Sequence, residues 1–152
     1  MPLLKSFKYA FLGIGYCIKN ERNMRIHIII ALYALYFSRY YSFSKVQYAV
    51  LCMLFALVIT MEMINTSIEK LVDISAPGFD FKAKAAKDIA AGAVCVCAIF
   101  SIIIGVLFYF DLDTLKFIAQ DTLFNPVRLI SFLGSTVLAV LFSIYGLAQK
   151  KI

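Results

Sequence analysis

Long apolar runs, separated by short charged segments, set the pattern of this chain. Residues 89–110 and 129–149 carry no charge, and residues 46–68 carry one carboxylate, Glu62. Because about 20 apolar residues cross a bilayer, these runs predict transmembrane helices over about 46–68, 89–110 and 127–147. A shorter run between Arg25 and Arg39 predicts a further span over about 26–43. That span requires both arginines to snorkel and the aromatic residues after Arg39 to lie at the interface.

The first stretch of the chain, residues 5–23, has a different pattern. Phe7, Phe11, Ile14 and Ile18 recur at helical spacing and so share one face, with lysines interleaved between them. An ordinary amphipathic helix against a protein core would show the same spacing. Lysines beside an apolar face, just before membrane spans, favour a helix that lies on the bilayer surface.

Composition supports this interpretation of the pattern. The chain has 152 residues, of which 62% are hydrophobic and 16% are charged, and its mean hydropathy is +0.87. These values exclude a typical soluble enzyme and predict an all-α, polytopic membrane helical bundle. The four cysteines form no CxxC pair and are expected to be buried thiols rather than metal ligands or disulfides: Cys17, Cys52, Cys95 and Cys97.

The distribution of Lys and Arg predicts the orientation of the spans in the cytoplasmic membrane. With a cytoplasmic N-terminus, four spans also leave the C-terminus in the cytoplasm, and the segment 111–125 forms an outer loop. Anionic lipid headgroups then suffice to explain the net charge of +6 without a nucleic-acid partner. Of the 15 basic residues, eleven fall on the inner side: Lys5, Lys8, Lys19, Arg22, Arg25, Lys70, Lys82, Lys84, Lys87, Lys150 and Lys151.

One stripe of polar residues runs down the predicted helix over 46–68 and continues past its end. Glu62, Asn65, Glu69 and Asp73 stand at i, i+3, i+7 and i+11, so they lie on one face. Glu62 lies about 24 Å along the span, near the inner headgroup boundary. Intramembrane carboxylates are usually functional, although Glu62 could instead pack helices together and Glu69 could be a solvated helix end.

The acidic residues on the predicted inner side suit the chemistry of phosphoryl transfer. Carboxylates at Glu21 and Glu69 suit a hard cation such as Mg²⁺, which takes its other ligands from water and substrate phosphates. Lys87, beside Asp88, could neutralise phosphate charge. The sequence contains no glycine-rich phosphate loop of the soluble kinase types.

Three segments resemble the small integral-membrane prokaryotic diacylglycerol kinases and undecaprenol kinases. They are NERNMRIH at 20–27, EMINTSIEKLVD at 62–73, and AKAAKDIAAGAV at 83–94. The second and third are specific, since an ExxNxxxE motif at a membrane exit is followed by AKD at family-like spacing. The resemblance covers about residues 5–110.

The resemblance implies a role for each candidate residue, with Mg²⁺ and ATP as cofactor and cosubstrate. Glu62 is implied to be the general base that takes the proton of the lipid hydroxyl, and Glu21 and Glu69 the Mg²⁺–ATP ligands. The family forms homotrimers with shared active sites, so a homotrimer is implied here. The remaining residues implied to contact the nucleotide or to support the site are Tyr9, Lys87, Asp88, Asn20, Asn65 and Asp73.

The chain also departs from the family pattern. The family usually ends after three spans, whereas residues 111–152 add a segment and a fourth span of unknown role beyond a kinase domain over 1–110. Together these features predict a Mg²⁺- and ATP-dependent kinase for a membrane lipid alcohol, either diacylglycerol or undecaprenol. The alternative is a non-enzymatic membrane scaffold or transporter component in which the polar stripe only packs helices.

Overall fold

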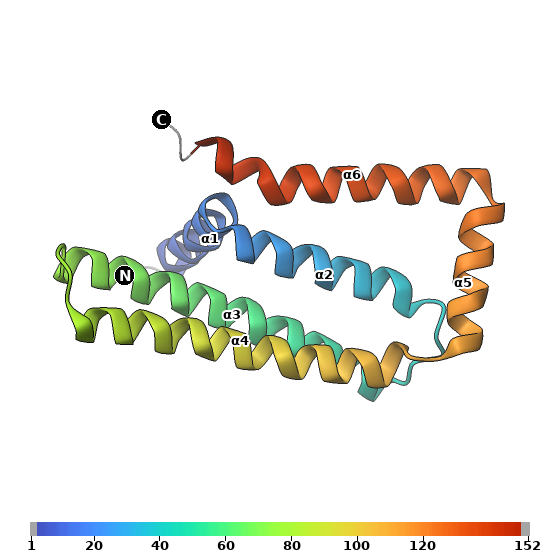
Figure 1. Ribbon diagram of the computed structural model, residues 1–152, viewed down its shortest axis with the longest axis horizontal. Coiled ribbons are helices and arrows are strands. Elements are labelled where there is room, and N and C mark those ends of the chain that lie inside the picture. Colours follow the sequence, from blue (N-terminus) through green and yellow to red (C-terminus); the bar gives the residue numbers. More distant parts are fainter. Residues whose placement is uncertain (1–2, 150–152) are drawn as a thin grey trace.

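The computed structural model describes residues 3–149 and their side chains through residue 145. Within this part of the chain there are six α-helices and no strand, which confirms the all-α prediction (Figure 1). The basic residues Lys150 and Lys151, assigned above to the inner side, lie outside the described residues. The helices are α1 (Leu3–Asn20), α2 (Arg22–Ser38), α3 (Lys45–Ser75), α4 (Phe81–Tyr109), α5 (Leu112–Phe124) and α6 (Pro126–Gln149).

Three of the described helices are long and apolar enough to cross a membrane: α3, α4 and the 126–145 part of α6. They contain the predicted spans over 46–68, 89–110 and 127–147, apart from Phe110, which follows the end of α4. Helix α2 has 17 residues and is not among the three, so its crossing of the membrane remains a prediction. It packs against α3 and α6, and its axis is roughly aligned with theirs (Figure 1).

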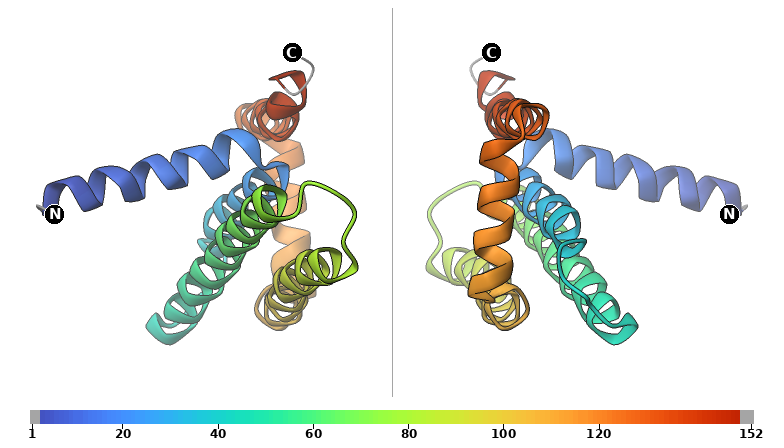
Figure 2. Two further views of the ribbon diagram at one scale, coloured as in Figure 1. Left: turned by 90° about the vertical axis from the view of Figure 1, so that its left-hand side faces the viewer. Right: turned by 90° about the vertical axis from the view of Figure 1, so that its right-hand side faces the viewer.

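The bundle is built on the antiparallel pair α3 and α4, with α2 packed against α3 and α6 packed against α2 (Figure 1). Helix α1 projects sideways from this bundle, and α5 crosses one end of it (Figure 2). The sideways course of α1 fits the predicted surface helix. Most large apolar side chains of α4 and α6 are exposed, as expected for helices whose surroundings are lipid. The few buried apolar residues are Cys17, Met24, Ala31, Leu51, Val58, Ala90 and Val94.

Side-chain caps fix the starts of several helices. Ser44 and Gln47 form a reciprocal capping box at the start of α3, and Asp80 accepts from the backbone N–H groups of Lys82 and Ala83 at the start of α4. Asp111 caps α5 through Thr114. Each cap satisfies backbone donors that the first helical turn leaves unpaired. Asn125 does the same for α6, which begins with Pro126, a residue suited to the first helical position.

The structure differs from the sequence expectations at several element ends. The surface helix ends at Asn20 rather than at residue 23, and α2 ends at Ser38 rather than at residue 43, because the chain turns through residues 39–43. The segment 111–125, expected as a loop, contains helix α5. The charged residues of this segment made a helix hard to predict, although Asp111 caps its start.

Two expectations about single residues also fail. Of the four cysteines, only Cys17 is buried, while Cys52 and Cys95 are exposed and Cys97 is intermediate. These three lie on helices whose apolar exterior needs no protein cover. Arg25 does not snorkel: it is 1% exposed, because carbonyl groups inside the protein accept its hydrogen bonds.

Candidate active site

A cluster of polar residues forms where the corner between α1 and α2 meets α3. Glu62 of α3 is 2% exposed, and its carboxylate lies within electrostatic range of Glu21 and Glu69 and beside the Asn23 side chain. The structure therefore brings together the three glutamates that the sequence singled out. Three like charges so arranged repel one another, which favours a proton or a cation among them.

The residues that α3 contributes to this cluster are three or four positions apart, so they lie on one face of the helix. Glu62 and Asn65 lie one turn apart and are both buried, together with Thr66. Asn65 Nδ2 donates to Glu69 Oε1 at 2.9 Å, and Thr66 Oγ1 donates to the Glu62 carbonyl at 3.0 Å. The polar stripe predicted from the sequence is thus buried at Glu62 and Asn65, half-buried at Glu69 and exposed at Asp73.

Glu21 stands in the one-residue gap between α1 and α2. It occupies the N-cap position of α2, where an acidic side chain normally accepts a backbone N–H, yet its carboxylate makes no such bond. The Glu21 carboxylate is thus left free to serve as a ligand. Asn20, expected to orient a carboxylate, instead donates its Nδ2 to the Tyr16 carbonyl at 2.8 Å and so helps to end α1.

Cys17, Asn23 and Thr66 belong to this cluster but were missed as site residues from the sequence. Burial raises the pKa of the Cys17 thiol, which contacts Thr66 and lies near the charges of Glu21 and Glu62. A signal existed for Thr66, which stands four residues after Glu62 and therefore on the same helical face. Nothing in the pattern marked Cys17, because a small apolar residue on an amphipathic helix is expected in any core.

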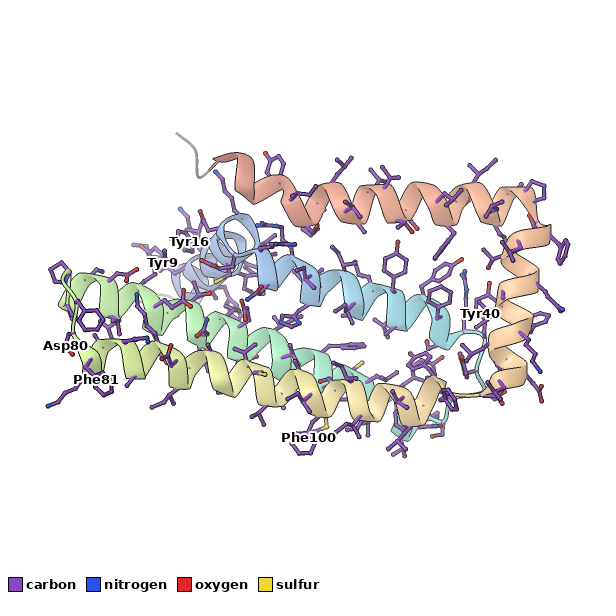
Figure 3. The ribbon with its side chains drawn as sticks, viewed as in Figure 1. Tyr9, Tyr16, Tyr40, Asp80, Phe81 and Phe100 are labelled. Carbon is purple, nitrogen blue, oxygen red and sulfur yellow. The ribbon has the colours of Figure 1, made fainter. Side chains whose placement is uncertain are left out.

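The remaining predicted residues lie near the end of α3, near the start of α4 and on α1. Lys87 of α4 pairs with Asp73 of α3, and the pair is partly exposed, so it adds little to stability. Asp88 is exposed. Tyr9 lies on α1, at the same end of the molecule as Asp80 and Phe81, and is also exposed (Figure 3). The structure thus does not bring Tyr9 and Asp88 into contact with the glutamate cluster.

The donors in the glutamate cluster fit a magnesium ion. Asn65 Oδ1 is buried and has no hydrogen-bond partner, although the other end of the same amide holds Glu69. Amide and carboxylate oxygens are the ligands that Mg²⁺ prefers, and Mg²⁺ commonly uses only one or two carboxylates plus substrate phosphates. Among the described residues no group of three His, Cys, Asp or Glu side chains is arranged to hold a metal ion, so phosphate oxygens and water would have to supply the other ligands of Mg²⁺.

Comparison with known proteins now identifies the family. The family model described as prokaryotic diacylglycerol kinase matches residues 8–109. The chain belongs to the prokaryotic diacylglycerol kinase family. The match contains every candidate site residue named above and stops at the end of α4, so α5 and α6 lie beyond the part that defines the family.

Individual members of the diacylglycerol kinase family show the same extent of similarity. The chain is 36% identical over 104 residues to a diacylglycerol kinase of Synechocystis, covering 68% of this chain and 59% of that protein. It is 38% identical over 105 residues to the undecaprenol kinase of Bacillus subtilis, covering 69% of this chain and 85% of that protein. A diacylglycerol kinase of Helicobacter pylori is 32% identical over 98 residues, which cover 64% of this chain and 77% of the relative. No solved structure matches the chain.

Proposed function

We propose that this protein transfers the γ-phosphoryl group of ATP to the hydroxyl of a membrane lipid, either diacylglycerol or undecaprenol, with Mg²⁺ as cofactor. The observation that carries the proposal is the buried Glu62 carboxylate, which lies just past the middle of a helix long enough to cross the membrane and has Glu21 and Glu69 nearby. The names of the relatives support the lipid substrate.

Glu62 acts as the general base in this proposal. Its carboxylate accepts the proton of the lipid hydroxyl, and the hydroxyl oxygen forms a bond to the γ-phosphorus. The bond between that phosphorus and the oxygen bridging to the β-phosphate breaks, which releases ADP and the phosphorylated lipid. Burial of Glu62 among the neighbouring side chains limits the motion of its carboxylate, and such positioning is the main requirement of phosphoryl transfer.

Glu21 and Glu69, with the unpartnered Oδ1 of Asn65, would hold Mg²⁺. When bound there, Mg²⁺ supplies positive charge that offsets the negative charge of the phosphates. Asn65 positions Glu69 through its Nδ2. Lys87 would bind phosphate oxygens after leaving Asp73, and the exposed side chains of Tyr9 and Asp88 would contact the nucleotide.

The test measures transfer of labelled phosphate from ATP to each lipid in mixed micelles. We expect the wild-type protein to phosphorylate at least one lipid and Glu62→Gln to lower turnover by about 10²–10⁴-fold, the usual effect of losing a general base. The matched control is Asp113→Asn, which neutralises a carboxylate whose side chain is 95% exposed on α5 and should leave turnover unchanged.

Size-exclusion chromatography of each variant shows whether the assembly, proposed to be a homotrimer, is retained. A Glu62→Gln protein that keeps its assembly and full turnover would contradict the role of Glu62. Absence of transfer to both lipids by the wild-type protein would contradict the proposed activity and favour a non-enzymatic role. Comparing the two lipids at equal mole fraction decides which one is the substrate.

A further inference from the structure

Helices α5 and α6 lie outside the family match, yet they contact the family part of the chain at three levels. Helix α6 runs antiparallel to α2 along its length and lies away from α3 and α4 (Figure 1). An apolar helix in lipid gains little from hydrophobic association, so polar contacts and close packing decide where it docks. The three contacts therefore indicate why α6 lies against α2.

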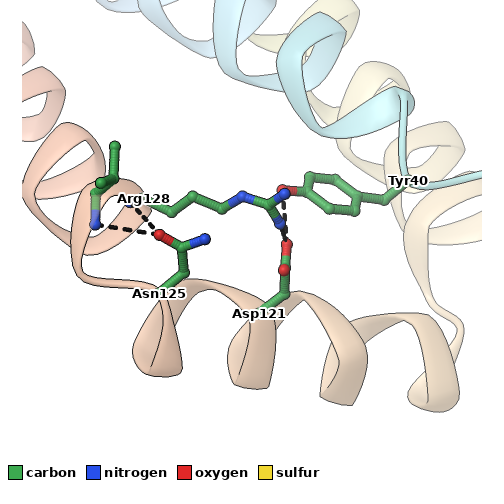
Figure 4. A network of polar contacts seen from close by, with 5 residues as sticks. Tyr40, Asp121, Asn125 and Arg128 are labelled. Carbon is green, nitrogen blue, oxygen red and sulfur yellow. Dashed lines mark hydrogen bonds and ion pairs between the residues drawn. The ribbon is translucent and has the colours of Figure 1, made fainter.

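The first contact is at the end of α2 where α5 meets α6. Asp121 of α5 pairs with Arg128 of α6 and accepts from the Tyr40 hydroxyl at 3.3 Å (Figure 4). The second is in the middle of the helices, where the Tyr33 hydroxyl and Ser135 Oγ are 3.0 Å apart. Phe132 packs its ring edge-on against Tyr33 beside this bond. Both contacts join α2 to the added segment.

The third contact involves Arg25, near the start of α2. Its Nη2 donates to the Ser143 carbonyl of α6 at 3.3 Å, and its Nη1 donates to the carbonyls of Ile18 and Lys19 at 2.9 and 3.1 Å. Arg25 is 1% exposed, and no carboxylate pairs with it among the described residues. A buried guanidinium is costly without partners, and Arg25 Nε already lacks one, so loss of any of the three carbonyl acceptors would add to that cost.

The carbonyls of Ile18 and Lys19 belong to the last turn of α1, where backbone acceptors lack helical partners and the helix dipole favours a cation. Arg25 therefore ties the end of α1 to the first turn of α2. Glu21 lies between these two anchor points, with no cap bond of its own. The position of the Glu21 carboxylate thus depends on the angle that Arg25 fixes.

We propose that α6 supports the active site: its Ser143 carbonyl accepts a hydrogen bond from Arg25, and Arg25, as a positioning residue, holds Glu21 beside Glu62 and Glu69. The inference rests on the proposed function for the role of Glu21 as a metal ligand. It assigns the added helix a role in holding the corner between α1 and α2.

The test uses the full chain with Cys52, Cys95 and Cys97 replaced by alanine, so that the buried Cys17 reports on the corner. Tyr33→Phe combined with Asp121→Ala removes the hydrogen bonds of the two remote contacts without touching the site. We expect the rate of Cys17 alkylation by N-ethylmaleimide, measured without nucleotide or metal, to rise at least about fivefold, because the corner opens more often. The matched control is Leu141→Ala, an exposed position of α6 that makes none of the three contacts.

Kinetics provide the second measurement. Arg25→Met should raise the Mg²⁺ concentration for half-maximal activity by about 10-fold or more while maximal turnover changes less, and Arg25→Lys should recover part of the loss. Unchanged Cys17 alkylation in the double variant overturns the proposal. This measurement does not use Arg25→Met, so it decides the proposal even if Arg25→Met fails to fold. Wild-type protein without kinase activity would overturn the proposed function alone, since the alkylation measurement does not depend on it.

Discussion

The two ends of the Asn65 amide differ in their hydrogen bonding. Its Nδ2 holds Glu69, while its Oδ1 is buried with no partner. A buried polar atom left unpaired costs about 1–3 kcal/mol, so the folded protein carries this penalty until a ligand arrives. The unpaired Asn65 Oδ1 therefore lowers the stability of the folded protein and, at the same time, is available to bind a cation.

Replacing Asn65 by alanine tests this interpretation. The variant loses one hydrogen bond and the unpaired oxygen together, so we expect the free energy of unfolding to change by less than about 1 kcal/mol. We expect the Mg²⁺ concentration for half-maximal activity to rise by about 10-fold or more. Chemical denaturation and Mg²⁺ titration of lipid phosphorylation provide the two numbers. Ser67→Ala is the control, because Ser67 is exposed and bonds only the Met63 carbonyl. A large loss of stability with unchanged Mg²⁺ dependence would contradict the role of Asn65.

Cys17 gives a second prediction for single residues. Burial raises the pKa of its thiol, so less of it is thiolate at neutral pH and its alkylation is slow. With Cys52, Cys95 and Cys97 replaced by alanine, we expect N-ethylmaleimide to modify the folded protein slowly at pH 7 and the unfolded protein quickly. Mass spectrometry after timed quenching measures both rates. Equal rates in the two states would show that Cys17 is accessible.

The sequence is a good guide to residues that share a helix and a poor one to residues that meet across helices. The spacing of Glu62, Asn65 and Glu69 predicts that they share one face of a helix, and α3 confirms it. The approach of Cys17 and Asn23 to that face depends on the angle between α1 and α2. No periodicity along the chain encodes that angle, because it depends on the hydrogen bonds from Arg25 to the carbonyls of Ile18 and Lys19.

At the scale of elements, helix starts are governed by short-range hydrogen bonds that can be tested by pH. Hydrogen bonds from the side chain and backbone of Thr114 lower the pKa of Asp111 below its ordinary value of 3.8. A lowered pKa in the folded state means that the ionised cap stabilises α5 at all pH values above 3.8. This stabilisation is lost as the pH falls through the pKa of the folded state.

We therefore expect the first-turn amides of α5 to exchange faster at low pH than the intrinsic exchange rate alone predicts. Hydrogen exchange with mass spectrometry at about pH 6 and about pH 2.5, corrected for intrinsic rates, measures the loss of protection. In Asp111→Asn the neutral cap accepts the same bonds at every pH, so its protection should not change. Parallel loss of protection in both proteins would show that another group is responsible.

The elements themselves were predictable where one physical cause dominates. Long apolar runs with at most one charge located α3, α4 and α6, because burial of charge in lipid is costly over the whole length of a helix. The ends of α2 and the presence of α5 were not predictable in this way. Tyr40 and Tyr41 are equally suited to a helix or a turn, and three acidic residues concealed the capped helix that follows Asp111.

At the scale of the whole molecule, the arrangement of helices makes the predicted orientation testable. The loop after α3 and helix α5 lie at opposite ends of the bundle (Figure 1). Gly78 in this loop and Asp113 of α5 are both exposed, and the space around Gly78 is open to a side chain. With Cys52, Cys95 and Cys97 replaced by alanine, we expect a membrane-impermeant maleimide to label Asp113→Cys on intact cells and Gly78→Cys only after permeabilisation. The reverse pattern, or labelling of both on intact cells, would contradict a cytoplasmic active site.

The docking of α6 on α2 shows what remains outside the reach of sequence at this scale. The helix carries no charge after Arg128, and its contacts with α2 use a serine hydroxyl, an aromatic edge and a backbone carbonyl. Groups of this kind occur on many faces of many apolar helices. The face of α6 that packs on α2 is therefore determined only by the combined geometry of α2, α5 and the corner at Glu21.

The brief turn through residues 39–44, closed by the Ser44 capping box, has a consequence for biogenesis. The apolar run of α2 is too short, and too closely bracketed by Arg25 and Arg39, to partition into a bilayer by itself. Helix α3 follows almost at once and partitions strongly. We therefore predict that α2 enters the bilayer together with α3 as a helical hairpin while the chain leaves the ribosome. Lengthening this turn should then reduce the yield of inserted protein before it alters the stability of the finished fold.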